Sequence, residues 1–354
     1  RDGLVTGVQT CALPISGLFG KWSLGGLGST GYPTRRGFDE WFGYFSQGHA
    51  HNYYPEHLLH NDTAVLLRGN SGTQRKDYAH DLFTERALGF LDRRSAQPFF
   101  LHLCYTIPHA NNEMGRDTGD GMEVPDYGVY AGKPWPKQEK GFAAMITRMD
   151  RDIGRLLDRL KQTGQDGNTL VIFSSDNGPH REGGHDPAFF ESSGPLRGIK
   201  RDLYEGGIRV PAMARWPGRI RAGQTSEYPW AFWDFLPTAA ELAGARSPAG
   251  LDGISIAPVL LGKPQRRRPY FYWEFHEGGF QQAVRVDDWK GVRAGKGGPV
   301  ELYDLRADPG ERENIAARHP DVAARIAGIM DTARTESEFF PVADGPKPPR
   351  ESGT

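Results

Sequence analysis

An apolar run that ends in two oxygen-bearing side chains constrains the fold of this chain most strongly. Leu170-Val171-Ile172-Phe173 predicts a buried strand, and Asp176-Asn177-Gly178 follows it closely. Upstream, apolar side chains between residues 142 and 160 recur at helical spacing and predict a long amphipathic helix that ends near Gly164. Helices that alternate with buried strands are typical of an α/β protein with a mainly parallel sheet covered on both faces.

The same periodicities predict most of the remaining elements. Further helices are expected at residues 78–94, 230–244 and 320–336, with Pro237 marking a boundary or kink in the second. Further strands are expected at residues 98–105 and 210–216. Residues 17–44 are rich in glycine and residues 111–137 in glycine and proline, so we expect loops in both segments.

The sequence pattern changes after residue 262. Arg266-Arg267-Arg268 favours a solvated loop, and short apolar segments separated by turn signals follow it at residues 270–275, 283–286, 289–294 and 300–305. This pattern indicates a small antiparallel subdomain. The expected organisation is a main domain at 17–265, a C-terminal α+β subdomain at 266–340 and a tail at 341–354.

Composition excludes several classes of protein. The net charge of −1 over 354 residues gives no indication of binding to nucleic acid or to an anionic membrane surface. No apolar run approaches the roughly 20 residues of a membrane span. The two cysteines, Cys11 and Cys104, make a disulfide framework unlikely and leave the compartment open.

Residues 1–16 differ in character from the rest of the chain. The segment from Val5 to Ile15 resembles the translation of a sequencing-library adapter and has neither helical nor strand periodicity. We therefore exclude residues 1–16 from the interpretation of the fold, as is usual for segments of foreign origin. On this reading the gene is cut at its 5′ side and its true N-terminal region is missing.

Oxygen ligands and lysines are the first candidate site residues. Carboxylate and amide oxygens suit calcium or magnesium, so Asp176 and Asn177 are candidate metal ligands, although Asp-Asn-Gly is also a good turn sequence. Lys200 lies between Gly198 and the turn Glu205-Gly206-Gly207, and Lys21 follows Gly20; both are candidate cations for an anionic group. The alternative for both is an ordinary surface lysine.

Histidines form the second group of candidates. His109 follows a predicted strand, where α/β enzymes place catalytic groups, and is a candidate general acid. His49 and His51 have a spacing that can bind zinc, but no matching Cys or His cluster follows, so a loop that lines the substrate site is favoured. His180 and His185 flank Gly183-Gly184 and face either a pocket or solvent.

Taken together and in this order, the motifs resemble the formylglycine-dependent sulfatase family, from residue 17 to about residue 320. The matching segments are Gly20-Lys21-Trp22-Ser23-Leu24-Gly25, Pro33-Thr34-Arg35-Arg36-Gly37-Phe38-Asp39, Pro108-His109, Ser175-Asp176-Asn177-Gly178, Leu196-Arg197-Gly198-Ile199-Lys200, Tyr204-Glu205-Gly206-Gly207-Ile208-Arg209-Val210-Pro211 and Glu301-Leu302-Tyr303-Asp304-Leu305.

The resemblance implies an alkaline-phosphatase-like fold and hydrolysis of sulfate esters. It implies that Asp176 and Asn177 bind Ca²⁺, with Mg²⁺ less favoured, and that Lys21 and Lys200 neutralise the charge of the sulfate and leaving group. It also implies that His109 protonates the leaving oxygen. Substrate contacts are expected from the four other histidines and from Arg197.

Two departures from the family pattern matter. Neither cysteine is followed by the Pro/Ala and Arg of the family's Cys-x-Pro/Ala-x-Arg motif, and the N-terminal pair of aspartate ligands is absent. We therefore expect the chain by itself to be inactive, with the formylglycine upstream. Ser23 stands where many relatives have a histidine that holds the hydrated formylglycine.

Two alternative functions stay open at this point. Metal ligands and a lysine suit phosphate equally, so a phosphatase or phosphodiesterase of the same fold is one alternative, and a non-catalytic glycan-binding relative is another. The resemblance implies a glycan sulfate ester as substrate, a periplasmic or secreted location, and maturation by a formylglycine-generating enzyme. It implies neither a nucleic-acid partner nor a membrane span.

Overall fold

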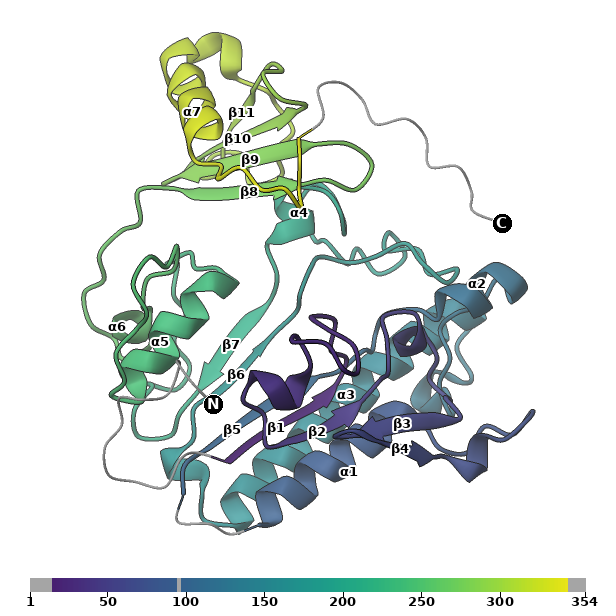
Figure 1. Ribbon diagram of the computed structural model, residues 1–354. Helices are drawn as coiled ribbons and strands as arrows, with labels where there is room; N and C mark the ends of the chain where they lie inside the picture. The colour runs from purple at the N-terminus through teal and green to yellow at the C-terminus, as the bar shows by residue number, and fades with distance from the viewer. Residues whose placement is uncertain (1–14, 94–96, 343–354) are drawn as a thin grey trace. The chain divides into compact units, whose positions relative to one another are not determined.

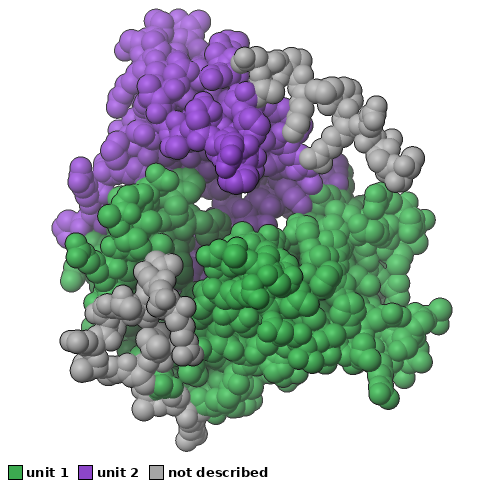
Figure 2. Space-filling view, in the orientation of Figure 1, with its two compact units in different colours: residues 1–171, 182–186, 214–263 green, residues 172–181, 187–213, 264–354 purple. Residues whose placement is uncertain are grey.

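The computed structural model describes residues 15–93 and 97–342, which form two compact units (Figures 1 and 2). The first unit contains the described residues up to 171, together with 182–186 and 214–263. The second contains 172–181, 187–213 and the described residues from 264 to 342. Of the predicted foreign segment 1–16, only Ile15 and Ser16 are described, and of the predicted tail 341–354 only residues 341 and 342.

A five-stranded sheet forms the centre of the first unit, in the order β4-β3-β2-β1-β5. Its strands are β1 (Ile15–Gly20), β2 (Glu40–Gly43), β3 (His57–His60), β4 (Thr63–Leu66) and β5 (Phe99–Cys104). β1 pairs in parallel with β2 and β5, whereas β3 and β4 add an antiparallel edge. The sheet is therefore mixed. The prediction of a loop over residues 17–44 was wrong at β1 and β2, because frequent glycines obscured two short buried strands.

Alternation along the strands gives the sheet two apolar faces. Phe19, Phe42 and Leu58 pack on one face with α1 (Ala79–Asp92) and α3 (Lys137–Gln162). Their neighbours Leu18, Trp41 and Leu59 point to the other face, because successive strand side chains alternate. That face is covered by residues of the loop after β1, including Tyr32 and Phe38, and at Phe100 by Phe235 of α5 (Phe235–Leu242).

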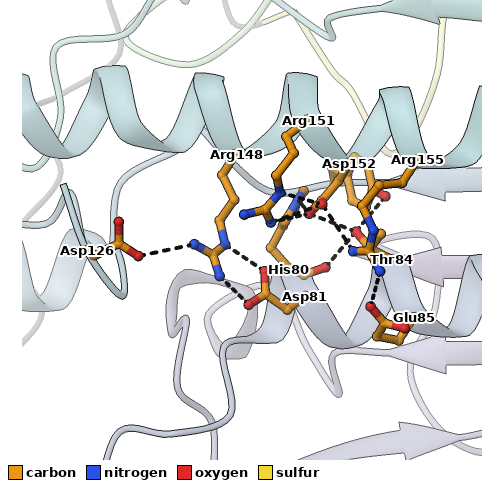
Figure 3. A network of polar contacts seen from close by, with 10 residues as sticks. His80, Asp81, Thr84, Glu85, Asp126, Arg148, Arg151, Asp152 and Arg155 are labelled. Atoms are coloured by element: carbon orange, nitrogen blue, oxygen red, sulfur yellow. Dashed lines mark hydrogen bonds and ion pairs between the residues drawn. The ribbon is translucent and has the colours of Figure 1, made fainter. Parts of the chain in front are cut away.

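A polar network joins α1 to α3 (Figure 3). Arg148 of α3 donates two hydrogen bonds to Asp81 of α1, at 2.6 and 2.5 Å. Asp152 has no exposed side-chain surface and lies 3.1 Å from His80 Nε2. Burial alone would raise the pKa of Asp152, but hydrogen bonds from His80, Arg151 and Arg155 outweigh burial and hold that pKa well below its usual range. The two predicted helices are thus confirmed, and charge as well as apolar packing links them.

The second unit contains the predicted antiparallel subdomain. β8 (Phe271–Phe275), β9 (Gln281–Val286), β10 (Trp289–Ala294) and β11 (Glu301–Asp304) form a sheet in the order β11-β10-β9-β8. α7 (Pro320–Thr332) packs on this sheet through Ile326 and Met330 against Val284 and Leu302. All four predicted strands and the final helix are confirmed.

Two further strands, β6 (Val171–Ser174) and β7 (Ala212–Arg215), pair with each other as a two-stranded sheet, and both were predicted. The short helices α4 (Glu205–Ile208) and α6 (Ala257–Leu260) complete the set. α2 (Asn112–Thr118) lies inside the predicted loop 111–137; its N-cap is Asn111, whose side chain accepts the Met114 N–H at 3.1 Å, and it has no apolar period. Among the described helices, none combines the length and apolar character needed to cross a bilayer.

Candidate functional site

Asp176 and Asn177 lie just beyond β6, in the second unit. Asp176 is exposed, and Asn177 is half-buried with its amide nitrogen donating to Gly178 O at 2.9 Å. The amide oxygen is therefore the atom of Asn177 suited to a cation. Gly178 N donates to Gly207 O at 2.9 Å, and a Cβ at Gly178 would lie 1.9 Å from Gly206 O. Only glycine lets the loop approach α4 this closely.

Lys200 is held beside the same loop. Its backbone N–H donates to Pro179 O at 2.8 Å, while Gly206 N donates to Arg197 O at 2.6 Å. The segments 176–179 and 197–207 therefore run next to each other in the second unit. Backbone hydrogen bonds therefore bring the segment that carries Asp176 and Asn177 beside the segment that carries Lys200, which lies 23 positions after Asn177 in sequence.

The donor set fits part of a hard-cation site. Two oxygen-bearing side chains suit Ca²⁺ or Mg²⁺, but calcium takes about 6–8 oxygen ligands. Within residues 15–93 and 97–342, no group of three or more His, Cys, Asp or Glu side chains is arranged to hold a metal ion. Asp176 and Asn177 would thus supply only a portion of a metal shell.

Arg197 is occupied by other parts of the second unit. Its guanidinium lies 3.8 Å from the centroid of the Tyr204 ring and donates to Tyr303 Oη at 2.9 Å and to Glu311 O at 3.1 Å. These contacts bind the motif segment to the end of β11 and to the turn that follows it. They give Arg197 a structural role.

His109 lies in the first unit, beyond the end of β5. Its Nδ1 is 2.7 Å from Ala110 O, and its Nε2 is 3.3 Å from Glu182 Oε2. Both ring nitrogens face oxygen acceptors, and only the protonated imidazolium can donate at both. A protonated His109 would therefore find an acceptor at each ring nitrogen, which is compatible with a general acid.

His51 lies directly against His109. The two rings are parallel within 9° with centroids 5.3 Å apart, and His51 Nδ1 is 2.9 Å from Glu113 Oε2. The fold therefore brings together two of the five histidines singled out in the sequence. Sequence reasoning missed the two carboxylates, Glu113 and Glu182, because neither belongs to a motif.

The other three histidines lie elsewhere. His49 accepts from Phe45 N and stacks on His57, and burial together with His57 lowers its pKa to about 4, so the ring is neutral near pH 7. His185 has no exposed side-chain surface; it stacks on Phe142 and binds Glu139 at 2.7 Å. His180 is buried in the second unit. None of these positions shows a substrate-facing role.

Lys21 follows β1 in the first unit, and its N–H donates to Cys104 O at 2.9 Å. The next residue but one, Ser23, donates its hydroxyl to the side chain of Gln47. This contact places Ser23 beside the loop that carries His49 and His51. Lys21 and His109 belong to one unit and the metal candidates to the other.

Comparison with protein families gives two matches. The family model described as Sulfatase matches residues 16–245. A second model, described as N-sulphoglucosamine sulphohydrolase, C-terminal, matches residues 199–334 and so covers the antiparallel subdomain.

Curated relatives and solved structures agree with these matches. The chain is 27% identical to the uncharacterized sulfatase YdeN of Escherichia coli, covering 84% of this chain and 56% of YdeN. It is 30% identical to human N-acetylgalactosamine-6-sulfatase, covering 73% of this chain and 48% of that protein. The chain thus spans about half the length of these relatives. The crystal structure of Ps i-CgsB in complex with k-i-k-neocarrahexaose has a TM-score of 0.77 and 26% identity, covering 91% of this chain and 71% of that one.

Proposed function

Since the chain belongs to the sulfatase family, we propose that the protein hydrolyses sulfate esters of carbohydrates. One observation supports this proposal beyond family membership. Backbone hydrogen bonds join Gly178 to Gly207 and Pro179 to Lys200, so the segment with two hard oxygen ligands runs beside the segment with a lysine, and these residue types suit a cation and a tetrahedral anion.

Lys200 acts on the sulfate as a fixed positive charge. A cation held in place before reaction stabilises the negative charge that develops on the sulfate oxygens and on the leaving oxygen. Lys21 is proposed to act in the same way, as the family resemblance of its motif implies. Asp176 and Asn177 would hold Ca²⁺, which supplies further positive charge to the sulfate oxygens when bound.

His109 is the proposed general acid. An imidazolium at this position would find an acceptor at each ring nitrogen, Ala110 O and Glu182. Proton transfer from Nε2 to the departing sugar oxygen would leave a neutral alcohol. Tyr53 donates its hydroxyl to the backbone carbonyl of His109, and this fixes the position of the main chain from which the ring extends.

The remaining elements of the proposal rest on the family. Formylglycine would supply the nucleophile, made by a formylglycine-generating enzyme, and no Cys-x-Pro/Ala-x-Arg motif occurs among the 354 residues. A sulfated glycan is the proposed substrate, in keeping with the N-acetylgalactosamine-6-sulfatases among the relatives. Export to the periplasm or outside the cell is proposed for the same reason.

A binding measurement separates this function from a phosphatase. Isothermal titration of the purified chain with glucosamine 6-sulfate and with glucosamine 6-phosphate, in the presence of Ca²⁺, is expected to show preference for the sulfate. Lys200→Met is expected to weaken sulfate binding about ten- to a hundredfold, since a hydrogen bond to a charged group contributes about 1.5–3 kcal/mol. The matched control is Lys296→Met, an exposed lysine of the second unit. Preference for the phosphate would favour the phosphatase, and equal affinity in wild type and Lys200→Met would contradict the proposal.

A further inference from the structure

A cavity adjoins the two stacked histidines in the first unit. Its volume is about 430 Å³, and it is lined by Asn112, Glu113, Gly115, Arg116, Glu182 and Gly183. This volume falls within the roughly 300–1,000 Å³ of small-molecule sites. Two of its lining residues, Glu113 and Glu182, are the carboxylates that pair with His51 and His109. The cavity therefore adjoins the Nε2 side of His109, the proposed general acid, through Glu182.

Backbone forms part of the cavity lining. Gly183 has φ +63°, and a Cβ there would lie 2.5 Å from Ala110 Cβ. A Cβ at Gly115 would lie 2.7 Å from Gly183 Cα. Because α2 and residues 182–186 approach through glycines, the two carboxylates and the histidine pair are held in one compact arrangement.

The residues that line the cavity carry more negative than positive charge. Glu113 and Glu182 carry carboxylates, and the single cation, Arg116, lies 3.3 Å from Glu113 and is largely exposed. Burial would raise the pKa of Glu113, but its backbone contact and His51 outweigh burial and lower that pKa, so Glu113 is anionic at neutral pH. A second sulfate or a uronate placed here would meet like charge, whereas hydroxyl and ammonium groups donate to the carboxylates.

We propose that this cavity is a specificity subsite that binds a hydroxylated or amino-bearing part of the sugar and disfavours a second anionic substituent there. The proposal rests on the proposed sulfatase function, since it takes His109 as the general acid for the sugar oxygen. Glu113 is assigned two tasks: it positions His51 against His109, and its charge selects the ligand. Arg116 offsets part of this charge from the outer side.

The test uses the purified chain with Ca²⁺ and three probes: glucosamine, glucosamine 6-sulfate and glucosamine 2-N,6-O-disulfate. Titration calorimetry is expected to show at least about tenfold tighter binding of the monosulfate than of the disulfate. Glu113→Gln, which keeps the shape and removes the charge, is expected to reduce this ratio below about threefold. Glu85→Gln, at an exposed carboxylate of α1 paired with Arg155, is the matched control and leaves the ratio unchanged.

The outcomes separate this proposal from the proposed function. If Lys200→Met weakens both sulfated probes equally while Glu113→Gln changes only their ratio, both proposals are supported. If neither sulfated probe binds but glucosamine binds in a Glu113-dependent way, the subsite is supported and the sulfate site is refuted. Equal affinity for mono- and disulfate, a ratio unaffected by Glu113→Gln, or no binding of any probe would overturn the subsite. Circular dichroism of each variant confirms that it is folded.

Discussion

Lys290 offers the sharpest test of how the second unit holds its motif segment. Its side chain is fully buried on β10, with Nζ 2.9 Å from Glu205 Oε1 and 3.1 Å from Glu311 Oε1. Glu205 is the first residue of α4, and its N–H donates to the other oxygen of Glu311 at 2.6 Å. Lys290 thus connects the antiparallel sheet to the helix against which Gly178 packs. The perturbation is Lys290→Met.

The expected loss of stability follows from the carboxylates of Glu205 and Glu311, which lose their ammonium partner in Lys290→Met. Removing one partner of a buried ion pair costs about 3–5 kcal/mol, because the remaining charge loses its compensation. Burial raises the pKa of Glu311, and Lys290 opposes that rise, so the variant lets this pKa climb further. A carboxyl whose pKa is raised by folding favours the folded state below its unfolded pKa and loses that contribution as pH rises. The deficit of Lys290→Met is therefore smallest near pH 4 and largest near pH 7.

The assay is urea denaturation followed by tryptophan fluorescence between pH 4 and 8. Lys296→Met, at an exposed lysine of the same subdomain, serves as the matched control and is expected to change stability by less than about 0.5 kcal/mol. The double variant Lys290→Met/Glu311→Gln should recover part of the loss at pH 7, because it removes one unpaired charge. A cost below about 1 kcal/mol, or no dependence on pH, would refute the reasoning.

Three further predictions concern the core and the loop. Asp152→Asn should lower the free energy of unfolding by about 2–4 kcal/mol in urea denaturation. Because folding lowers the pKa of Asp152, its contribution to stability is present above about pH 4 and is lost as the pH falls. The variant should therefore lose less stability than wild type between pH 5 and pH 2. Gly178→Ala should cost about 1–3 kcal/mol, since its Cβ would meet Gly206 O at 1.9 Å, whereas Gly167→Ala, which has open space, should change little; equal costs would contradict the close approach. Burial raises the pKa of Cys104 to about 12, so at pH 8 iodoacetamide should modify it far more slowly in folded than in unfolded chain, as measured by peptide mass spectrometry.

Sequence periodicity predicted the long elements that bury one side. α3 is the clearest case, since apolar residues such as Met145 and Leu160 recur over its 26 residues. The short apolar segments and the turn signals between them were also sufficient to predict β8 to β11. β1 and β2 were not predicted, because they are short, buried on both faces and interrupted by glycine. These features remove both the helical and the strand periodicity of apolar residues. α2 was not predicted, because this seven-residue helix has an Asn111 N-cap but no apolar face that the sequence pattern could reveal.

The candidate site shows a similar division. Motifs predicted Asp176, Asn177 and Lys200 as candidates, and backbone hydrogen bonds bring the two segments that carry them side by side. Glu113 and Glu182 could not be found in this way, because their importance comes from contacts with His51 and His109 across the fold. His185 looked like a site residue in sequence, yet its ring is packed between Phe142 and Glu139. A histidine near a motif carries no information about which way its ring points.

The central claim is that the loop after β6 forms, with Lys200, a site for calcium and sulfate. The most direct measurement titrates the chain with glucosamine 6-sulfate, with Ca²⁺ and with chelator, in wild type and in Asp176→Ala/Asn177→Ala. We predict that Ca²⁺ strengthens binding of the sulfate at least about tenfold in wild type and has no effect in the double variant, because binding of the two ligands is reciprocal. Sulfate binding that is independent of Ca²⁺, or a calcium effect that persists in the double variant, would contradict the assignment.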